Sequence, residues 1–356
     1  MNLNQEQDTN LDVAEIVSLL ESNDKSEVEA LRARAEQVCL KTFGRDVYLR
    51  AIIEFSNCCR QDCLYCGLRR SNAGLKRYRM STDEILEMAV RAAGLGYKTI
   101  VLQSGEDPYY SDADIARLIE VIKSRADVAI TLSLGERDAA AYRSWIEAGA
   151  NRYLMRHETS NPELYARLHP GHTLEQRLDH LRTLKALGYQ VGAGNMVGLP
   201  GQTTKDIAGD LLLMKELDVD MAGIGPFIPN PSTPLGDTEG GTLDLVLREI
   251  ALLRILMPEV MIPATTALGT KGPNAREEAF RWGANVIMPN VTPMRYRPMY
   301  ALYPGKICTD QDAAQCTSCV KARVLAAGRT VGMGYGHSPK FLRNKAQRVQ
   351  AQEVIQ

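Results

Sequence analysis

Three closely spaced cysteines carry the strongest chemical signal in the sequence. Cys59, Cys63 and Cys66 are separated by three and by two residues, and they follow an apolar run at 48–55 that is typical of a strand. Three thiolates are one fewer than the usual four that hold a cubane iron–sulfur cluster. One iron would stay open to a ligand that is not protein. The spacing therefore predicts a [4Fe-4S] cluster with one open iron.

Other uses of three cysteines fit this loop less well. Zinc would need a fourth Cys or His nearby, and no His lies between residues 59 and 66. A disulfide does not suit a reducing cytosol. The spacing instead resembles the signature of radical S-adenosylmethionine (SAM) enzymes, in which Tyr65 would be the aromatic residue before the last cysteine.

Composition places the chain among ordinary globular proteins. It has 356 residues, of which 45% are hydrophobic and 24% charged, with a net charge of -1. This balance gives no sign of a nucleic-acid or membrane-surface partner. The first ten residues have no signal-peptide pattern, and no run of about 18 apolar residues exists. We expect a cytoplasmic protein with no membrane span.

The chain alternates between apolar strand-like runs and amphipathic helical segments. Helical spacing at 11–21 and 26–39 precedes the repeat, and the predicted strands are 48–55, 99–103, 128–134, 152–155, 189–197, 220–225, 260–264 and 284–288. Eight such units predict a complete (β/α)8 barrel, with a doubly wound sheet as the alternative. We divide the chain into an N-terminal helical extension (1–47), the barrel (48–300) and a C-terminal extension that closes the barrel (301–356).

Polar and glycine-rich residues follow the predicted strands, at the barrel mouth where such folds place their chemistry. An open iron needs a chelating ligand, and the amine and carboxylate of a methionine unit supply one. Ser104, Gly105 and Glu106 follow the second strand and are candidates for the methionyl amine. Glu158 is a candidate for the ribose or the amine. Arg177 can form a fork with a carboxylate, although its helix position also suits a surface arginine.

A second group of mouth residues suits an anion. Arg156 follows the fourth strand, and Thr265 with Thr266 would add hydroxyl groups, unless these threonines are core β-branched residues. His157 is expected to pack in its loop. The remaining histidines of this half, His169, His172 and His180, are expected on the surface.

Three more cysteines lie near the C-terminus. Cys308, Cys316 and Cys319 border a polar stretch and predict a second cluster, either [2Fe-2S] or [4Fe-4S], with a peripheral role. Cys58 adjoins Cys59 and could compete as a ligand, but the spacing of the first triad requires Cys59.

Several longer segments resemble the [FeFe]-hydrogenase maturase family HydE. They are RAIIEFSN at 50–57, VLQSGEDPYY at 101–110, GIGPFIP at 223–229, IPATTA at 262–267 and YPGKIC at 303–308. The likeness runs from about residue 10 to residue 330. These strings are far more specific than the cysteine spacing alone.

The resemblance implies a radical SAM enzyme that acts in assembly of the hydrogenase di-iron cluster. Its substrate would be a cysteine-bound iron complex with CO and cyanide, supplied by the maturase HydG, and its product would pass toward the maturase HydF. An electron donor such as ferredoxin or flavodoxin is implied. Cluster ligands carry over to the first triad, and SAM contacts to Gln103, Ser104, Glu158, Arg177 and Met221. An anion site carries over to Arg156, Thr265 and Thr266, with Tyr303 near the cavity. The C-terminal triad occurs in only some members.

Four alternatives remain open from the sequence. Methylornithine synthase shares the barrel and the first triad and would act on an amino-acid-derived substrate, and biotin synthase is a more distant relative. A non-catalytic iron–sulfur carrier would not cleave SAM, and a structural zinc protein would be colourless. Likeness of fold alone does not prove a reaction.

Overall fold

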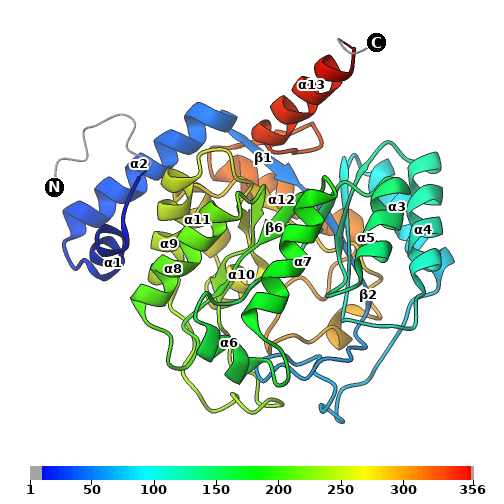
Figure 1. Ribbon diagram of the computed structural model, residues 1–356, viewed down its shortest axis with the longest axis horizontal. Helices are drawn as coiled ribbons and strands as arrows, with labels where there is room; N and C mark the ends of the chain where they lie inside the picture. The colour runs from blue at the N-terminus through cyan, green and yellow to red at the C-terminus, as the bar shows by residue number, and fades with distance from the viewer. Residues whose placement is uncertain (1–9, 354–356) are drawn as a thin grey trace.

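The computed structural model describes residues 10–353, in which strands and helices alternate as the sequence predicts (Figure 1). The helices are α1 (Val13–Glu21), α2 (Lys25–Phe43), α3 (Thr82–Gly94), α4 (Asp112–Arg125), α5 (Ala139–Glu147), α6 (Pro162–Leu168), α7 (Leu174–Ala186), α8 (Thr204–Glu216), α9 (Leu243–Leu256), α10 (Thr266–Lys271), α11 (Ala275–Arg281), the 3-10 helix η1 (Arg297–Met299), α12 (Ala313–Ala326) and α13 (Pro339–Glu353). The strands are β1 (Asp46–Leu49), β2 (Ala51–Ser56), β3 (Thr99–Ser104), β4 (Ala129–Ser133), β5 (Arg152–Leu154), β6 (Gln190–Ala193), β7 (Met196–Val197), β8 (Met221–Ala222), β9 (Gly225–Pro226), β10 (Pro263–Ala264), β11 (Val286–Ile287) and β12 (Thr330–Gly332).

Eight parallel strand positions form a ring. Six strands pair in the order β2-β3-β4-β5-β6-β8, and a second sheet has the order β10-β11-β1-β12. Parallel bridges join the two sheets on both sides, between Met221 and Met261 and between Ile52 and Asn290. Because β1 and β2 are consecutive halves of the first strand, these pairings close the circle. The predicted (β/α)8 barrel is confirmed.

Two predicted strands are shorter than the sequence suggests. The run at 189–197 ends as β6 at Ala193 and resumes as β7, and the run at 220–225 likewise divides into β8 and β9. Gly194 has a φ of +141°, a conformation that L side chains rarely adopt, and it turns the chain between β6 and β7. The pair β7-β9 therefore forms a small separate sheet.

Local signals in the sequence explain where the helices begin. Capping boxes are formed at Ser81 with Glu84 and at Thr173 with Gln176, as the sequence predicts. In each, two backbone N–H groups of the first turn gain side-chain acceptors. The apolar faces of these helices then pack on the strands, so that β2, for example, is buried along its whole length.

The extensions pack against the barrel at different places. Helices α1 and α2 contact α8 and α9 on the barrel wall (Figure 1). Residues 330–338 reach the amino ends of the strands, where β12 pairs with β1 and the Tyr335 carbonyl accepts a hydrogen bond from Arg152. Helix α13 projects from the body. Across residues 10–353 the search for a helix of membrane-spanning length and hydropathy finds none.

Candidate active site

The predicted cluster loop follows β2 and is fixed to the barrel from several sides. The side-chain amide of Asn57 donates to the carbonyls of Lys76 (2.8 Å) and Met299 (2.7 Å). Arg77 donates to four carbonyls of the same loop. Backbone N–H groups of Leu64 and Gly67 reach the end of α6 and the C-terminal segment. A long loop rich in polar residues is thereby held in one shape without forming a helix or strand.

The three thiols of this loop lie near one another in a partly buried setting. Burial raises the pKa of Cys59, and it raises the pKa of Cys66 to about 12. The pKa of Cys63 is also raised, first by burial and then by the neighbouring thiols. A bound metal reverses this tendency because its charge stabilises the thiolates. In the folded chain, loss of the thiol protons would therefore depend on the positive charge of a bound cluster.

These thiols do not form a compact site for one metal ion. Tetrahedral zinc would bring four ligands to about 2.3 Å from one centre. Among residues 10–353, no three Cys, His, Asp or Glu side chains are grouped to hold a single ion.

Gly105 lies directly behind the cysteine loop. Its N–H donates to the Ser56 carbonyl, and a Cβ atom at this position would lie 2.2 Å from the Cys58 oxygen and 2.9 Å from the Cys59 Cβ. Only glycine permits this approach. The next N–H, that of Glu106, points to the Cys59 sulfur at 3.4 Å.

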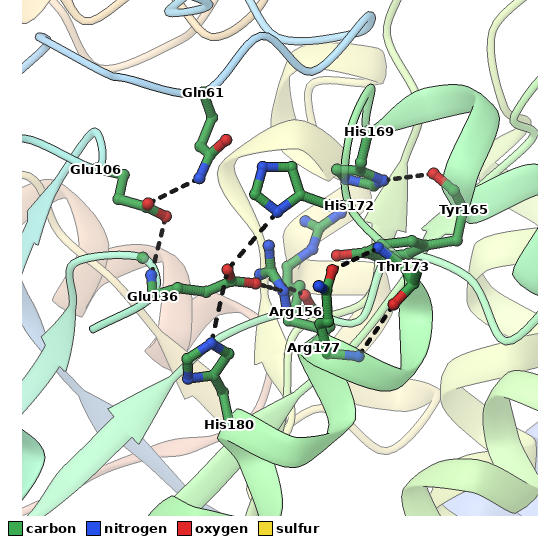
Figure 2. Close-up of polar contacts among 12 residues, drawn as sticks. Gln61, Glu106, Glu136, Arg156, Tyr165, His169, His172, Thr173, Arg177 and His180 are labelled. Atoms are coloured by element: carbon green, nitrogen blue, oxygen red, sulfur yellow. Dashed lines mark hydrogen bonds and ion pairs between the residues drawn. The ribbon is translucent and has the colours of Figure 1, made fainter. Parts of the chain in front are cut away.

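The carboxylate of Glu106 braces the cluster loop. It is buried and accepts hydrogen bonds from Gln61 Nε2 (2.7 Å) and the Glu136 N–H (2.9 Å) (Figure 2). A third bond comes from Arg60 Nε (2.5 Å). The Glu106 carboxylate, which the sequence suggested as a partner for the methionyl amine, thus already accepts from three protein donors. The neighbouring hydroxyl of Ser104 donates to the Gly105 carbonyl.

Tyr65 packs against a histidine that was expected on the surface. His169 is buried, and burial lowers its pKa to about 4. The neutral ring donates from Nδ1 to the Tyr165 carbonyl (2.9 Å), which leaves Nε2 to accept from the Tyr65 hydroxyl at 2.9 Å. The expectation for His169 was wrong because α6 folds its end against the cluster loop.

A pocket opens beside Cys63. It is a small hollow of about 230 Å³, open solvent included, and is lined by Gln61, Asp62, Cys63, His169, Pro170, His172 and Arg177. Arg177 is held there by Glu136, whose Oε1 lies 2.8 Å from Nε, and by the Arg156 carbonyl, 3.1 Å from Nη1. The guanidinium is largely buried, so the reading of Arg177 as a surface residue is wrong.

Glu136, His172 and His180 were missed as site residues. Glu136 is nearly buried, and His172 Nδ1 and His180 Nε2 approach its Oε2 at 3.9 and 3.7 Å (Figure 2). The sequence marked Glu136 only as one of several polar residues after β4. Its pairing with a helix some forty residues later is visible only in the folded chain.

Two of the predicted anion residues, Arg156 and Thr265, pack against the same short segment of the chain. Arg156 pairs with Glu158 through Nη2 (2.7 Å), and Glu158 has a positive φ of 67°, which is rare for a residue with a side chain. A Cβ on Gly223 would lie 3.6 Å from Arg156 Cδ, and one on Gly225 would lie 3.1 Å from Thr265 Oγ1. Arg156 and Thr265 thus each pack against the segment at 223–225.

The threonines and Tyr303 have defined structural roles as well. Thr265 caps α10, and Thr266 is the first residue of that helix. Tyr303 is bonded to Thr270, and burial raises its pKa. The threonines thus lie at a helix start and not in the barrel core.

Two other predicted SAM contacts lie farther inside the barrel. Gln103 donates to the Tyr300 hydroxyl at 3.2 Å. Met221 packs with Met261 and Val286, and its sulfur accepts from Arg50 Nη1 at 2.9 Å. Arg50 also bonds Gly336 in the segment at the amino ends of the strands. Met221 thus contacts an arginine that also bonds the C-terminal segment.

The C-terminal cysteines have a different setting. Cys316 and Cys319 lie one turn apart on α12, and Cys308 precedes that helix with a positive φ of 64°. The Cys316 thiol donates to Cys308, and nearby Arg276 and Arg297 help lower the pKa of Cys308.

Comparisons with known proteins agree with this geometry. The family model described as the radical SAM superfamily matches residues 53–214. The chain is 54% identical over 317 residues to the [FeFe] hydrogenase maturase subunit HydE of Thermotoga maritima, covering 89% of this chain and 91% of that protein. It is 32% identical to the 3-methylornithine synthase of Methanosarcina acetivorans, covering 76% and 77%.

Solved structures show the same fold. That of methylornithine synthase (PylB) aligns with a TM-score of 0.81 at 28% identity, over 91% of this chain and 94% of the other. The hydrogenase maturase HydG of Carboxydothermus hydrogenoformans aligns with a TM-score of 0.76 at 21% identity, over 90% and 75%.

Proposed function

The chain belongs to the radical SAM superfamily and, within it, to the [FeFe]-hydrogenase maturase family HydE, and from this membership we propose that it cleaves SAM reductively during assembly of the hydrogenase di-iron cluster. Membership of the superfamily implies a [4Fe-4S] cluster and SAM as cofactors. The observation that carries the proposal is the braced loop of Cys59, Cys63 and Cys66 beside the Arg177 pocket.

Each part of the mouth has a role in this proposal. Cys59, Cys63 and Cys66 would hold the cluster, which when bound supplies the electron that breaks a carbon–sulfur bond of SAM and yields a 5'-deoxyadenosyl radical. Arg177 would bind the methionyl carboxylate. Tyr65 would contact the adenosyl part, held by His169. Gly105 and Glu106 would fix the loop, and Glu158 would bind the ribose or the amine.

The substrate proposal concerns the other side of the mouth. Arg156, Thr265 and Thr266 would bind an anionic group of a cysteine-bound iron complex that carries CO and cyanide, with Tyr303 as part of the cavity wall. The positive charge of Arg156 and the threonine hydroxyls are suited to such a group. HydG would supply this substrate, HydF would receive the product, and a ferredoxin or flavodoxin would donate electrons.

A second proposal concerns the C-terminal extension. Its residues 301–353 would close the barrel at both ends, since Leu302 accepts from Gly67 at the mouth and Tyr335 accepts from Arg152 at the base. Cys308, Cys316 and Cys319 would bind a second, peripheral cluster.

Reconstitution with iron and sulfide in the absence of oxygen tests the main proposal. We expect an EPR signal of the reduced cluster that changes on addition of SAM, together with formation of 5'-deoxyadenosine. A signal indifferent to SAM, without deoxyadenosine, would favour an iron–sulfur carrier instead. Formation of a methylated ornithine from lysine would favour the methylornithine synthase reaction, to which the chain has 28–32% identity.

A further inference from the structure

Arg177 depends on a single carboxylate for its orientation. Glu136 Oε1 lies 2.8 Å from Arg177 Nε, and the relative exposure of the two side chains is only 9% and 15%. The pair is close but not aligned as a hydrogen bond, so its attraction is mainly electrostatic. At such burial a charge pair is screened weakly by solvent. Loss of Glu136 would leave the guanidinium with the Arg156 carbonyl and the neighbouring Tyr165 hydroxyl, and with no paired carboxylate.

Glu136 also contacts the cluster loop through its backbone. Its N–H donates to Glu106 Oε2 at 2.9 Å, and its carbonyl accepts from Arg60 Nη2 at 3.4 Å. Glu106 in turn accepts from Gln61 (Figure 2) and from Arg60. One residue at the end of β4 therefore joins the loop that carries Cys59 to the side chain of Arg177 on α7.

We propose that Glu136 is a positioning residue, which sets the distance and direction between the cysteine loop and Arg177 and so fixes where the methionyl carboxylate of SAM binds. The inference rests on the proposed function, because it assigns Arg177 to that carboxylate. A guanidinium held in its binding orientation before the ligand arrives loses less conformational freedom on binding. Glu136 touches neither ligand nor cluster in this role and acts through Arg177.

The nearby histidines offer a competing use of Glu136. Two imidazoles and a carboxylate are a familiar set of ligands for a transition metal. However, His172 and His180 are 3.9 and 3.7 Å from the same oxygen, and no three such side chains among residues 10–353 are grouped to hold an ion. Arg177 adds a positive charge beside that oxygen. The geometry favours positioning of Arg177 over binding of a metal.

Equilibrium dialysis with the full, anaerobically reconstituted chain tests this role. The variants are Glu136→Gln, Arg177→Gln and the double variant, and the two ligands are S-adenosylhomocysteine and 5'-methylthioadenosine, which lacks the amino-acid part. Glu36→Gln serves as a matched control, because Glu36 lies on α2, away from the mouth, and pairs with Arg32 of the same helix and with Arg329. Iron content and Tm report on folding.

Glu136→Gln is expected to weaken the binding of S-adenosylhomocysteine about tenfold, which is the scale of one charged contact. The affinity for 5'-methylthioadenosine should not change. The double variant should bind no more weakly than Arg177→Gln alone. In turnover the KM for SAM should rise while kcat at saturating SAM changes little. Glu36→Gln should match the parent protein.

Three results would overturn the inference. If Glu136→Gln keeps its affinity for S-adenosylhomocysteine while Arg177→Gln binds it more weakly, Glu136 is excluded as a positioning residue. The proposed function would still stand. Unchanged affinity in both variants would remove the proposed role of Arg177 as well. Equal weakening of both ligands would mean a general structural effect. If Glu136→Gln does not fold, Glu136→Asp gives the same test, because it keeps the charge but withdraws it from Nε.

Discussion

The two cysteine triads of this protein differ both in spacing and in surroundings: three and two residues separate the cysteines of the first, and seven and two those of the second. Cys59, Cys63 and Cys66 lie in an irregular loop at the barrel mouth, pressed against the backbone of Gly105 and next to the Arg177 pocket. Two of the C-terminal cysteines lie on α12, and Arg323 pairs there with Glu277 of α11. The pocket at the mouth includes none of the C-terminal residues.

This difference teaches that the surroundings of three cysteines, as well as their spacing, bear on whether they can hold a reactive cluster. A reactive cluster also needs an adjoining space for its ligand and charged side chains already directed into that space. The first triad has both. The second triad has Arg276 and Arg297 nearby. Two of its cysteines, however, lie on α12, a helix packed on the outside of the barrel.

The largest difference between the two triads is expected when one cysteine is removed from each. Cys63→Ala should abolish SAM cleavage, because two thiolates cannot hold the cluster with an open iron. Cys316→Ala should largely preserve cleavage. Formation of 5'-deoxyadenosine after reconstitution measures both. Full activity of Cys63→Ala would refute the cluster assignment.

Gly105→Ala affects the first triad alone, because Gly105 packs against the loop that carries it. The added Cβ would lie 2.2 Å from the Cys58 oxygen, so the cysteine loop must move. We expect a loss of roughly 1–3 kcal/mol of stability and less iron retained per chain. Gly94→Ala is the control, since no atom lies within 4 Å of its added Cβ. Equal iron content in the two variants would mean that the close approach of Gly105 is not needed to hold the cysteine loop.

Arginines beside the two triads can be compared in the same way. Arg156→Ala should weaken an anion bound inside the barrel about tenfold, the scale of one charge-assisted contact, and leave the cluster intact. Arg276→Gln, beside Cys308, should leave that anion site unchanged. Titration with iodide, located in crystals by its anomalous scattering, measures both. Arg156 would be excluded from the site by an unaltered iodide affinity.

The smallest effect is expected from the whole C-terminal triad. The triple change of Cys308, Cys316 and Cys319 to Ala should lower the iron content if a second cluster binds there. SAM cleavage should remain within about twofold of the parent, as for substitutions away from the site. EPR of the reduced protein with SAM should show the same response. Loss of cleavage would mean that the two triads work together.

Most of the fold could be predicted from the sequence because its signals are local. Apolar runs of strand length marked all eight barrel positions, and capping residues such as Ser81 and Thr173 marked helix starts. The breaks after Ala193 and Ala222 were not predicted, because an apolar run does not reveal where a strand leaves its partner. Gly194, with its positive φ, was the one local sign of the first break.

Chain order and residue type therefore determined the barrel, the mouth as the place of chemistry, and the cysteine loop as its centre. Only the tertiary structure decided how charges at that mouth pair. Glu106 turned out to brace Arg60 and Gln61, Met221 to lie beside Arg50, and Glu136 to hold Arg177. The physical reason is that ion pairs depend on distances of a few ångströms between residues far apart in sequence. Packing sets those distances, and residue type alone does not.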